Sequence, residues 1–232
     1  MKDYKIRNLI NYYLPKKKLN ILDCGCHKGN FLKKIGLKRL KNGYLVDPLD
    51  YNVIRKLKLK NFKFLPYCLG STSKKQSFTI YSSKYPEWSS INSLGPKSIY
   101  KKRYYKYLNK KNIKKFVHQT TIDNILKKNK KKIDILKIDC QSTSLEILEG
   151  SKKNLKKKSF NMIIVAINLS EFYKNKKDDF LKILKLLDTH GYELINIANA
   201  HSGKLGNLNY DFFNFKIWTF DSIFIKKNLS KI

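Results

Sequence analysis

Apolar positions along the chain recur with two different periods, and these periods indicate the expected elements. The apolar run at residues 19–23 predicts a short buried strand. Phe31, Leu32 and Ile35 then recur at helical spacing, which predicts a helix over residues 28–35. A strand, a turn and a helix in this order are the repeating unit of open α/β sheets.

The same two periods continue along the chain and predict an α/β fold. Further strands are expected at residues 44–47, 61–68, 76–81, 116–119, 133–139, 163–168, 192–197 and 215–225. Helices are expected at residues 3–14, 50–57, from about 121, from about 144 and at 178–187, the last with Phe180, Leu181, Leu184 and Leu187 facing the core. Residues 1–18 are then an N-terminal helical cover, and residues 19–232 form one domain.

The longest expected connection covers residues 82–97 and is rich in serine. Long ordered connections often cover a binding site. Tyr85 and Trp88 either stack on a substrate or the adenine, or pin this segment to the domain. Residues 97–115 interleave Lys with Tyr, which is typical of a solvated helix face and also of a surface that stacks bases and contacts phosphates.

The turn after the first strand carries candidate binding chemistry. Asp23, Gly25 and Gly29 follow the spacing Asp-x-Gly-x-x-x-Gly, so the Gly-x-Gly-x-x-Gly fingerprint of dinucleotide sites is not met. Glycines let the backbone approach a ligand closely, and the free N–H groups of a helix start face it. Cys26 and His27 lie inside this turn.

Asp47 ends the next expected strand and is followed by Pro48. In doubly wound sheets an acidic residue at this place accepts hydrogen bonds from ribose hydroxyls. The alternative is that Asp47 caps the following helix. Together with the first turn, Asp47 predicts a nucleoside-containing ligand. The missing third glycine favours an adenosine ligand without phosphates, such as S-adenosylmethionine.

A third informative stretch is the apolar strand at residues 133–139. Lys137 and Asp139 are two residues apart, so their side chains point to the same face of the strand. A lysine inside an apolar strand is costly unless it is paired. Asp139 and Gln141 follow the carboxyl end of the strand, where open α/β sheets bind their ligands. They are therefore expected beside the site that begins at Asp23.

The net charge of the chain changes the picture of its partners. The 232 residues include 50 Lys and Arg but only 17 Asp and Glu, which gives a formal charge of +33. Such an excess attracts nucleic acid or an anionic membrane surface. A chain rich in Lys, Asn, Ile, Tyr and Phe is also expected of an AT-rich genome, so composition alone is the alternative cause.

The remaining totals limit the class of protein. No apolar run approaches the ~20 residues of a membrane-spanning helix, and the first residues lack the apolar core of a signal peptide. The four cysteines have no second Cys/His pair at zinc spacing, which favours reduced thiols over a zinc site. The expected location is the cytoplasm.

Several stretches together resemble one protein family. Residues 23–29, 46–48, 121–123, 133–150 and 171–194 are similar to the FkbM-type S-adenosylmethionine-dependent O-methyltransferases. The resemblance implies the α/β class I methyltransferase fold, a Rossmann-like sheet of about seven strands with helices on both faces and an antiparallel last strand pair. It also implies methyl transfer to a hydroxyl, often on a sugar or a secondary metabolite.

The resemblance implies a role for individual residues as well. The ribose of S-adenosylmethionine would be held by Asp47 beside Pro48, and the adenine would lie near Leu69 and Gly70. The methionine part would lie along the first turn, formed by Asp23, Gly25, Cys26, His27 and Gly29.

Asp139 is expected at the reacting centre, as the base or as a metal ligand. A divalent metal would suit this chemistry, although no ligand motif indicates one. The other candidates for catalysis are Lys137 and, as weaker candidate bases, His118 and His201 in a polar loop at residues 199–214. Trp88 and Gln141 are the candidate substrate contacts.

The chain departs from the family pattern at two places. The family usually shows Gly-Ala-Glu after the position of Gln141, where residues 142–144 are Ser-Thr-Ser, and Ala166 stands near a usual glutamate. Two hypotheses follow. The first is an O-methyltransferase of a sugar, glycan precursor or other small metabolite. The second is a catalytically impaired protein of this fold that binds RNA or another polyanion through a basic surface.

Overall fold

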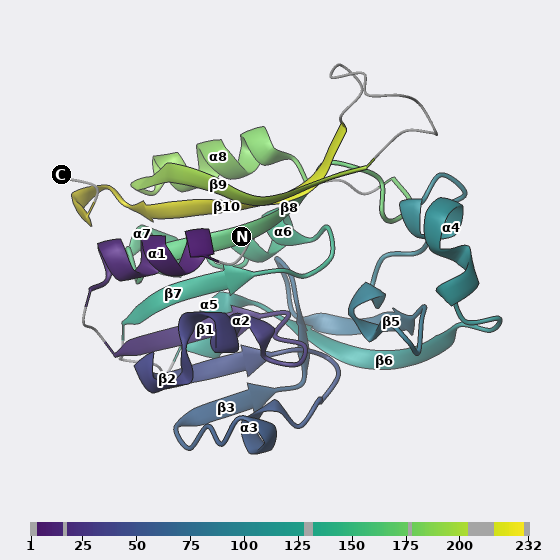
Figure 1. Ribbon diagram of the computed structural model, residues 1–232, viewed down its shortest axis with the longest axis horizontal. Helices are drawn as coiled ribbons and strands as arrows, with labels where there is room; N and C mark the ends of the chain where they lie inside the picture. The colour runs from purple at the N-terminus through teal and green to yellow at the C-terminus, as the bar shows by residue number, and fades with distance from the viewer. Residues whose placement is uncertain (1–3, 16–17, 128–131, 176–177, 204–215, 230–232) are drawn as a thin grey trace.

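A computed structural model describes residues 4–15, 18–127, 132–175, 178–203 and 216–229, and its centre is a seven-stranded sheet (Figure 1). The strand order is β3-β2-β1-β7-β8-β10-β9. The first five strands run parallel, whereas β10 is antiparallel to both of its neighbours, as predicted. The strands are β1 (Leu19–Cys24), β2 (Leu40–Val46), β3 (Phe62–Leu65), β7 (Ile133–Ile138), β8 (Phe160–Asn168), β9 (Tyr192–Gly203) and β10 (Lys216–Lys226).

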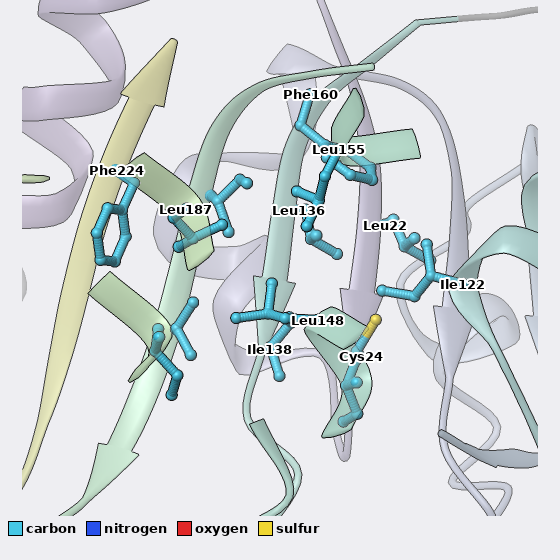
Figure 2. Close-up of a cluster of buried hydrophobic side chains, with 14 of the residues drawn as sticks. Leu22, Cys24, Ile122, Leu136, Ile138, Leu148, Leu155, Phe160, Leu187 and Phe224 are labelled. Atoms are coloured by element: carbon cyan, nitrogen blue, oxygen red, sulfur yellow. The ribbon is translucent and has the colours of Figure 1, made fainter. Parts of the chain in front are cut away.

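Helices cover both faces of this sheet. One face carries α1 (Tyr4–Tyr13), α2 (Asn30–Ile35) and α3 (Val53–Lys56), and the other carries α5 (Ile122–Leu126), α6 (Ser144–Glu149), α7 (Lys152–Lys156) and α8 (Phe180–Thr189). The helices of each layer pack on a separate apolar cluster. Figure 2 shows the cluster under α5 to α8. The result is the three-layer arrangement expected of a doubly wound sheet. None of the described helices is long and apolar enough to cross a membrane.

The period of two along the strands decides which side chains reach the site. In β1, Leu22 and Cys24 point into the cluster under α5 to α8 (Figure 2). Ile21 points into the opposite cluster. Asp23 has the parity of Ile21, so its carboxylate points towards the layer of α1 to α3. Asp23 pairs directly with Lys137 of β7, which therefore points to the same face.

A second, three-stranded sheet in the order β4-β6-β5 was not expected from the sequence. It consists of β4 (Tyr67–Leu69), β5 (Lys74–Ile80) and β6 (Ile113–Thr120). The strand predicted at residues 61–68 is divided at Pro66, because proline cannot donate a ladder hydrogen bond. Its first half joins the large sheet and its second half joins the small one.

Three other expectations are corrected. Within the Lys- and Tyr-rich segment only α4 (Ile99–Tyr104) is an α-helix, and residues 113–115 belong to β6. Leu181 is 74% exposed rather than facing the core, whereas Leu187 is buried as predicted, together with Ile183. Residues 199–203 continue β9 rather than forming a loop, and residues 204–214 lie outside the described chain. Short 3₁₀ turns occur at Leu37–Arg39, Pro86–Trp88, Tyr105–Tyr107 and Lys227–Leu229.

Candidate cofactor-binding site

A cavity of about 400 Å³ lies where β1, β2 and β7 end. In Figure 1 these parallel strands point towards the small sheet, and residues of both sheets line the cavity. This is the position at which open α/β sheets bind ligands, and the volume suits a drug-sized ligand. The predicted site residues that line it are Gly25, Cys26, His27, Asp47, Pro48, Leu69, Lys137, Asp139 and Gln141.

Lys137 links the two aspartates of the adjoining strands. Its Nζ lies 3.5 Å from Oδ1 of Asp23 and 3.2 Å from Oδ2 of Asp139, and it donates a hydrogen bond to the Gly25 carbonyl at 3.2 Å. Burial alone would lower the pKa of Lys137, but the two carboxylates outweigh burial and raise it. Lys137 is therefore a cation held between two carboxylates.

The two aspartates differ in their access to solvent. Asp23 is fully buried below the cavity, and its carboxylate has no polar partner in the described chain other than Lys137. Burial raises the pKa of Asp23, and the nearby charge of Lys137 opposes this rise. The Asp139 side chain is 47% exposed and lines the cavity. Of the two, Asp139 is the one that can contact a ligand.

Asp47 is held at the end of β2 by two backbone donors. The N–H of His27 donates to Oδ2 at 3.0 Å, and the N–H of Leu49 donates to Oδ1 at 2.9 Å. Burial raises the pKa of Asp47 to about 6, although both hydrogen bonds act to lower it. Each carboxylate oxygen keeps a further lone pair, so Asp47 could accept hydrogen bonds from two neighbouring hydroxyls of a ligand.

The first turn holds its shape through glycine and a strained histidine. Gly25 has φ +76°, and a Cβ at this position would lie 2.1 Å from the Asp139 carbonyl oxygen. His27 has φ 44° and stacks edge-on against Tyr51 at 4.6 Å between ring centroids. Burial lowers the pKa of His27, although Glu87 lies 3.5 Å from its Nε2.

Four predicted contacts do not line the cavity. Asp23 lies beneath it, and a Cβ added at Gly29 would meet the side chains of Val53 and Leu57 in the α3 region. Gly70 lies against the Gln119 side chain. Trp88 is stacked between two tyrosines, with centroids 4.5 Å from Tyr85 and 4.8 Å from Tyr100, which is the pinning role that the sequence left open.

The segment pinned in this way nevertheless borders the cavity. Pro86, Glu87 and residues 89–91 form part of its wall. Gln141 contacts the tyrosines that hold this segment. Its Oε1 lies 3.3 Å from the Tyr100 hydroxyl and 3.2 Å from the Tyr173 hydroxyl, and the Tyr173 hydroxyl lies 2.6 Å from the Trp88 carbonyl oxygen. The Gln141 side chain is therefore engaged in packing this wall as well as facing the cavity.

The backbones of the two candidate histidines lie in strands. His118 is exposed on β6 and is not among the cavity-lining residues. The backbone of His201 is in β9, where it pairs with Thr219. The prediction that His201 lies in a loop is therefore wrong. The strand continues because β9 and β10 keep pairing beyond residue 199, after an irregularity in their register.

Asp221 and Asn199 are two cavity residues that the sequence did not predict. Asn199 Nδ2 donates to Asp221 Oδ2 at 2.6 Å, and both residues line the cavity. Asn199 has φ 51° at the register irregularity between β9 and β10, and such irregularities re-aim side chains. Burial raises the pKa of Asp221, and the charge of Asp139 adds to this rise. An acidic residue within the otherwise apolar run of β10 was the sequence feature that could have indicated Asp221 as a site residue.

The cavity wall has an excess of acidic side chains, whereas the whole chain has a net positive charge. Four carboxyl groups line the cavity, from Asp47, Glu87, Asp139 and Asp221, against two lysines, Lys34 and Lys137. Among the described residues, no group of three His, Cys, Asp or Glu side chains is arranged to hold a metal ion. A wall of this kind suits a ligand with cationic groups and hydroxyls better than one with phosphates. The residues therefore fit S-adenosylmethionine.

Comparison with known proteins decides the family. The model of the methyltransferase FkbM domain matches residues 23–194. The chain belongs to the FkbM methyltransferase family. No curated protein matches its sequence.

One solved structure of this family has a similar fold, and other methyltransferase structures also match the chain. The FkbM methyltransferase from Methylobacillus flagellatus has a TM-score of 0.51 and 12% identity over 89% of this chain, which spans 43% of that protein. An S-adenosylmethionine-dependent methyltransferase from Clostridium acetobutylicum has a TM-score of 0.46 and 14% identity, over 97% of this chain and 92% of that one. One from Leishmania major has a TM-score of 0.45 and 12% identity, over 95% and 70%.

In this FkbM-family chain the two departures from the family pattern touch each other. The Ser144 hydroxyl donates to the Ala166 carbonyl oxygen at 3.0 Å. Two carboxyl groups from other elements lie beside these positions. Asp178 accepts hydrogen bonds from the backbone N–H of Ser144 and of Asn168, and Asp221 pairs with Ala166 across the β8–β10 ladder.

Proposed function

We propose that this chain is an S-adenosylmethionine-dependent O-methyltransferase that acts in the cytoplasm on a hydroxyl of a sugar, a glycan precursor or another small metabolite. The observation that carries the proposal is the acidic cavity at the carboxyl ends of β1, β2 and β7 in a chain of charge +33. A local excess of carboxylates in such a basic protein favours a cationic cofactor over a phosphorylated one.

The wall residues divide into three groups by what they could contact. Asp47, beside Pro48, would accept hydrogen bonds from the ribose hydroxyls, and Leu69 would contact the adenine. The first turn, with Gly25, Cys26 and His27, would lie along the methionine part. When bound, S-adenosylmethionine supplies a methyl group that is already activated for transfer to an oxygen.

The chain itself has to orient the acceptor hydroxyl and take its proton. Asp139 is the best placed residue for this, because it lines the cavity, is half-exposed and is oriented by Lys137. Asp221 is the second acid at the same wall, and its raised pKa would help it to hold a proton once it has been taken up. Gln141 borders the acceptor side of the cavity.

Isothermal titration calorimetry on purified, nucleic-acid-free protein tests the cofactor assignment. Micromolar binding of S-adenosylmethionine is expected, with no comparable binding of NAD⁺ or ATP, whose phosphates the acidic wall disfavours. Asp47→Ala should abolish the titration signal and leave the far-UV circular dichroism spectrum unchanged. Tighter binding of ATP than of S-adenosylmethionine would contradict the proposal.

A methyl-transfer assay then tests the acceptor class. Candidate sugars and nucleotide sugars would be incubated with S-adenosylmethionine labelled at its methyl group, and transfer to oxygen would be identified by mass spectrometry. Asp139→Asn should abolish turnover, while it retains cofactor binding. Unchanged turnover would reject Asp139 as the base.

A further inference from the structure

The small sheet has two faces of different character. Cross-strand pairs place Lys75 opposite His118, Ser77 opposite Phe116 and Thr79 opposite Lys114, so these side chains share one face. The alternate face carries Phe78 and Gln119, which are buried, and Phe78 lines the cofactor cavity. The first of these faces therefore points away from the cavity.

An unusually exposed aromatic ring lies on this outer face. Phe116 is 76% exposed, and Lys75 Nζ lies 5.1 Å from the centre of its ring. Lys114 and His118, on either side of Phe116 along β6, are also exposed. Side chains at alternate positions of a strand are about 6.6 Å apart, so the face presents a cation, an aromatic ring and an imidazole at regular steps.

The surrounding segment is strongly basic. Residues 71–120 contain twelve Lys and Arg residues but one acidic residue, Glu87. Glu87 lies 3.5 Å from His27 and lines the cofactor cavity, so its carboxylate is engaged at the site. Two of these lysines, Lys75 and Lys114, lie on the outer face, and the segment has no further acidic residue that could neutralise them.

We propose that the outer face of the small sheet, formed by Lys75, Lys114, Phe116 and His118, binds single-stranded nucleic acid. Aromatic rings on an open sheet stack bases irrespective of sequence, and flanking lysines neutralise phosphates. The Phe116 ring offers a base its exposed surface, while Lys75 and Lys114 flank it within one sheet face. This binding is separate from the proposed methyl transfer, because the face and the cavity lie on opposite sides of β5.

The same features argue against a protein partner. Protein interfaces bury contiguous apolar patches and are depleted in lysine at their centre. On this face Phe116 is a single apolar residue with lysines and a histidine as neighbours. The combination of an isolated ring and several cations fits a polyanion with stacking groups, which is nucleic acid.

Fluorescence anisotropy with a labelled single-stranded oligouridylate tests this proposal on the full chain. Phe116→Ala should weaken binding roughly tenfold, since stacking on one aromatic residue supplies an effect of this size. Phe116→Tyr keeps a ring and should bind like the wild type. The double variant Lys75→Ser/Lys114→Ser should reduce the slope of log affinity against log salt by about 1.4, the value for two phosphate contacts on a single strand.

Matched control residues lie on α8, which packs on the large sheet and is not part of the small sheet. Leu181 is 74% exposed, and Lys182 and Lys185 are exposed lysines. Leu181→Ala and Lys182→Ser/Lys185→Ser remove the same kinds of group, and both should change oligouridylate affinity by less than the matching variants of the outer face. Equal losses in both sets would show that net charge alone binds the oligonucleotide and would overturn the proposal. Binding to vesicles of phosphatidylserine and phosphatidylcholine that depends on Phe116, without oligouridylate binding, would also overturn it.

Discussion

Asp221 of β10 pairs directly with Ala166 of β8 across the antiparallel ladder. Directly opposed residues of an antiparallel pair point to the same face of the sheet, here the face that also carries Asp23 and Lys137. Ala166 stands near a position at which the family usually has a glutamate. The neighbouring strand thus brings a carboxylate to this part of the site, from a residue far away in the sequence.

Asp221→Asn should weaken S-adenosylmethionine binding about threefold to tenfold, while binding of S-adenosylhomocysteine changes less. The two ligands differ by one positive charge at sulfur, and a partly buried carboxylate nearby favours the charged one by an energy on the order of 1 kcal/mol. The amide can still accept the hydrogen bond from Asn199. Calorimetry with both ligands gives the comparison. An equal loss for both would show that Asp221 supports the fold of the wall rather than the cofactor charge.

Lys137→Met should lower the free energy of unfolding by about 3–5 kcal/mol, because it leaves the buried carboxylate of Asp23 without a partner. Urea denaturation at neutral pH measures this change. The double variant Asp23→Asn/Lys137→Met removes both charges and should recover part of the loss. A double variant that is no more stable than Lys137→Met would contradict the pairing.

Lys182→Met supplies the surface control for that experiment. Lys182 lies 3.2 Å from Asp179 three residues earlier, and its side chain is 72% exposed. Exposed ion pairs of this kind contribute little to stability, so the change should stay within about 0.5 kcal/mol. The contrast between the two lysines isolates burial as the cause.

The sequence predicted the parts of the fold that follow from local periodicity. Parallel strands end at one edge of a sheet, so Asp47 and Asp139 could be placed together from their positions alone, and both line the cavity. Alternation of apolar and polar residues continues across Pro66, so the local pattern predicts one strand where the structure has two. The pattern also predicts β6 too short, because Lys and Tyr suit a helix surface as well.

Asp221 and Asn199 show what the sequence could not provide. Asp221 lies in the middle of a strand, and its place beside the cavity depends on the register of β10 against β8. Asn199 reaches it through an irregularity between β9 and β10. Register between distant strands is set by tertiary packing, so neither contact follows from local pattern.

Gly25→Ala should abolish S-adenosylmethionine binding and destabilise the protein by more than Gly36→Ala does. Both glycines have positive φ, which costs another residue roughly 1–2 kcal/mol. At Gly25 the new Cβ would also meet the Asp139 carbonyl oxygen at 2.1 Å, whereas at Gly36 nothing lies within 4 Å. Urea denaturation and calorimetry separate strain from steric conflict. Similar losses in the two variants would contradict the close approach at Gly25.

Affinity for S-adenosylmethionine should rise as the pH increases from 5 to 7, with a midpoint near the Asp47 pKa of about 6. Only the carboxylate form of Asp47 can accept hydrogen bonds on all its lone pairs, so deprotonation favours a ligand that donates two hydroxyls. Asp47→Asn should flatten the profile. His27 borders the same cavity, and burial lowers its pKa.

Asp178 provides the matched control for this pH dependence, because burial also raises its pKa to about 6 although it does not line the cavity. Each raised pKa means that the folded chain binds a proton more tightly than the unfolded chain, whose Asp pKa is about 3.9. Each group therefore contributes most to stability below pH 4, and about 3 kcal/mol is lost as the pH rises through 6. Asp47→Asn and Asp178→Asn should both reduce this pH dependence in urea denaturation, but only Asp47→Asn should alter the pH profile of cofactor binding. A changed binding profile in Asp178→Asn would mean that Asp47 does not hold the ribose alone.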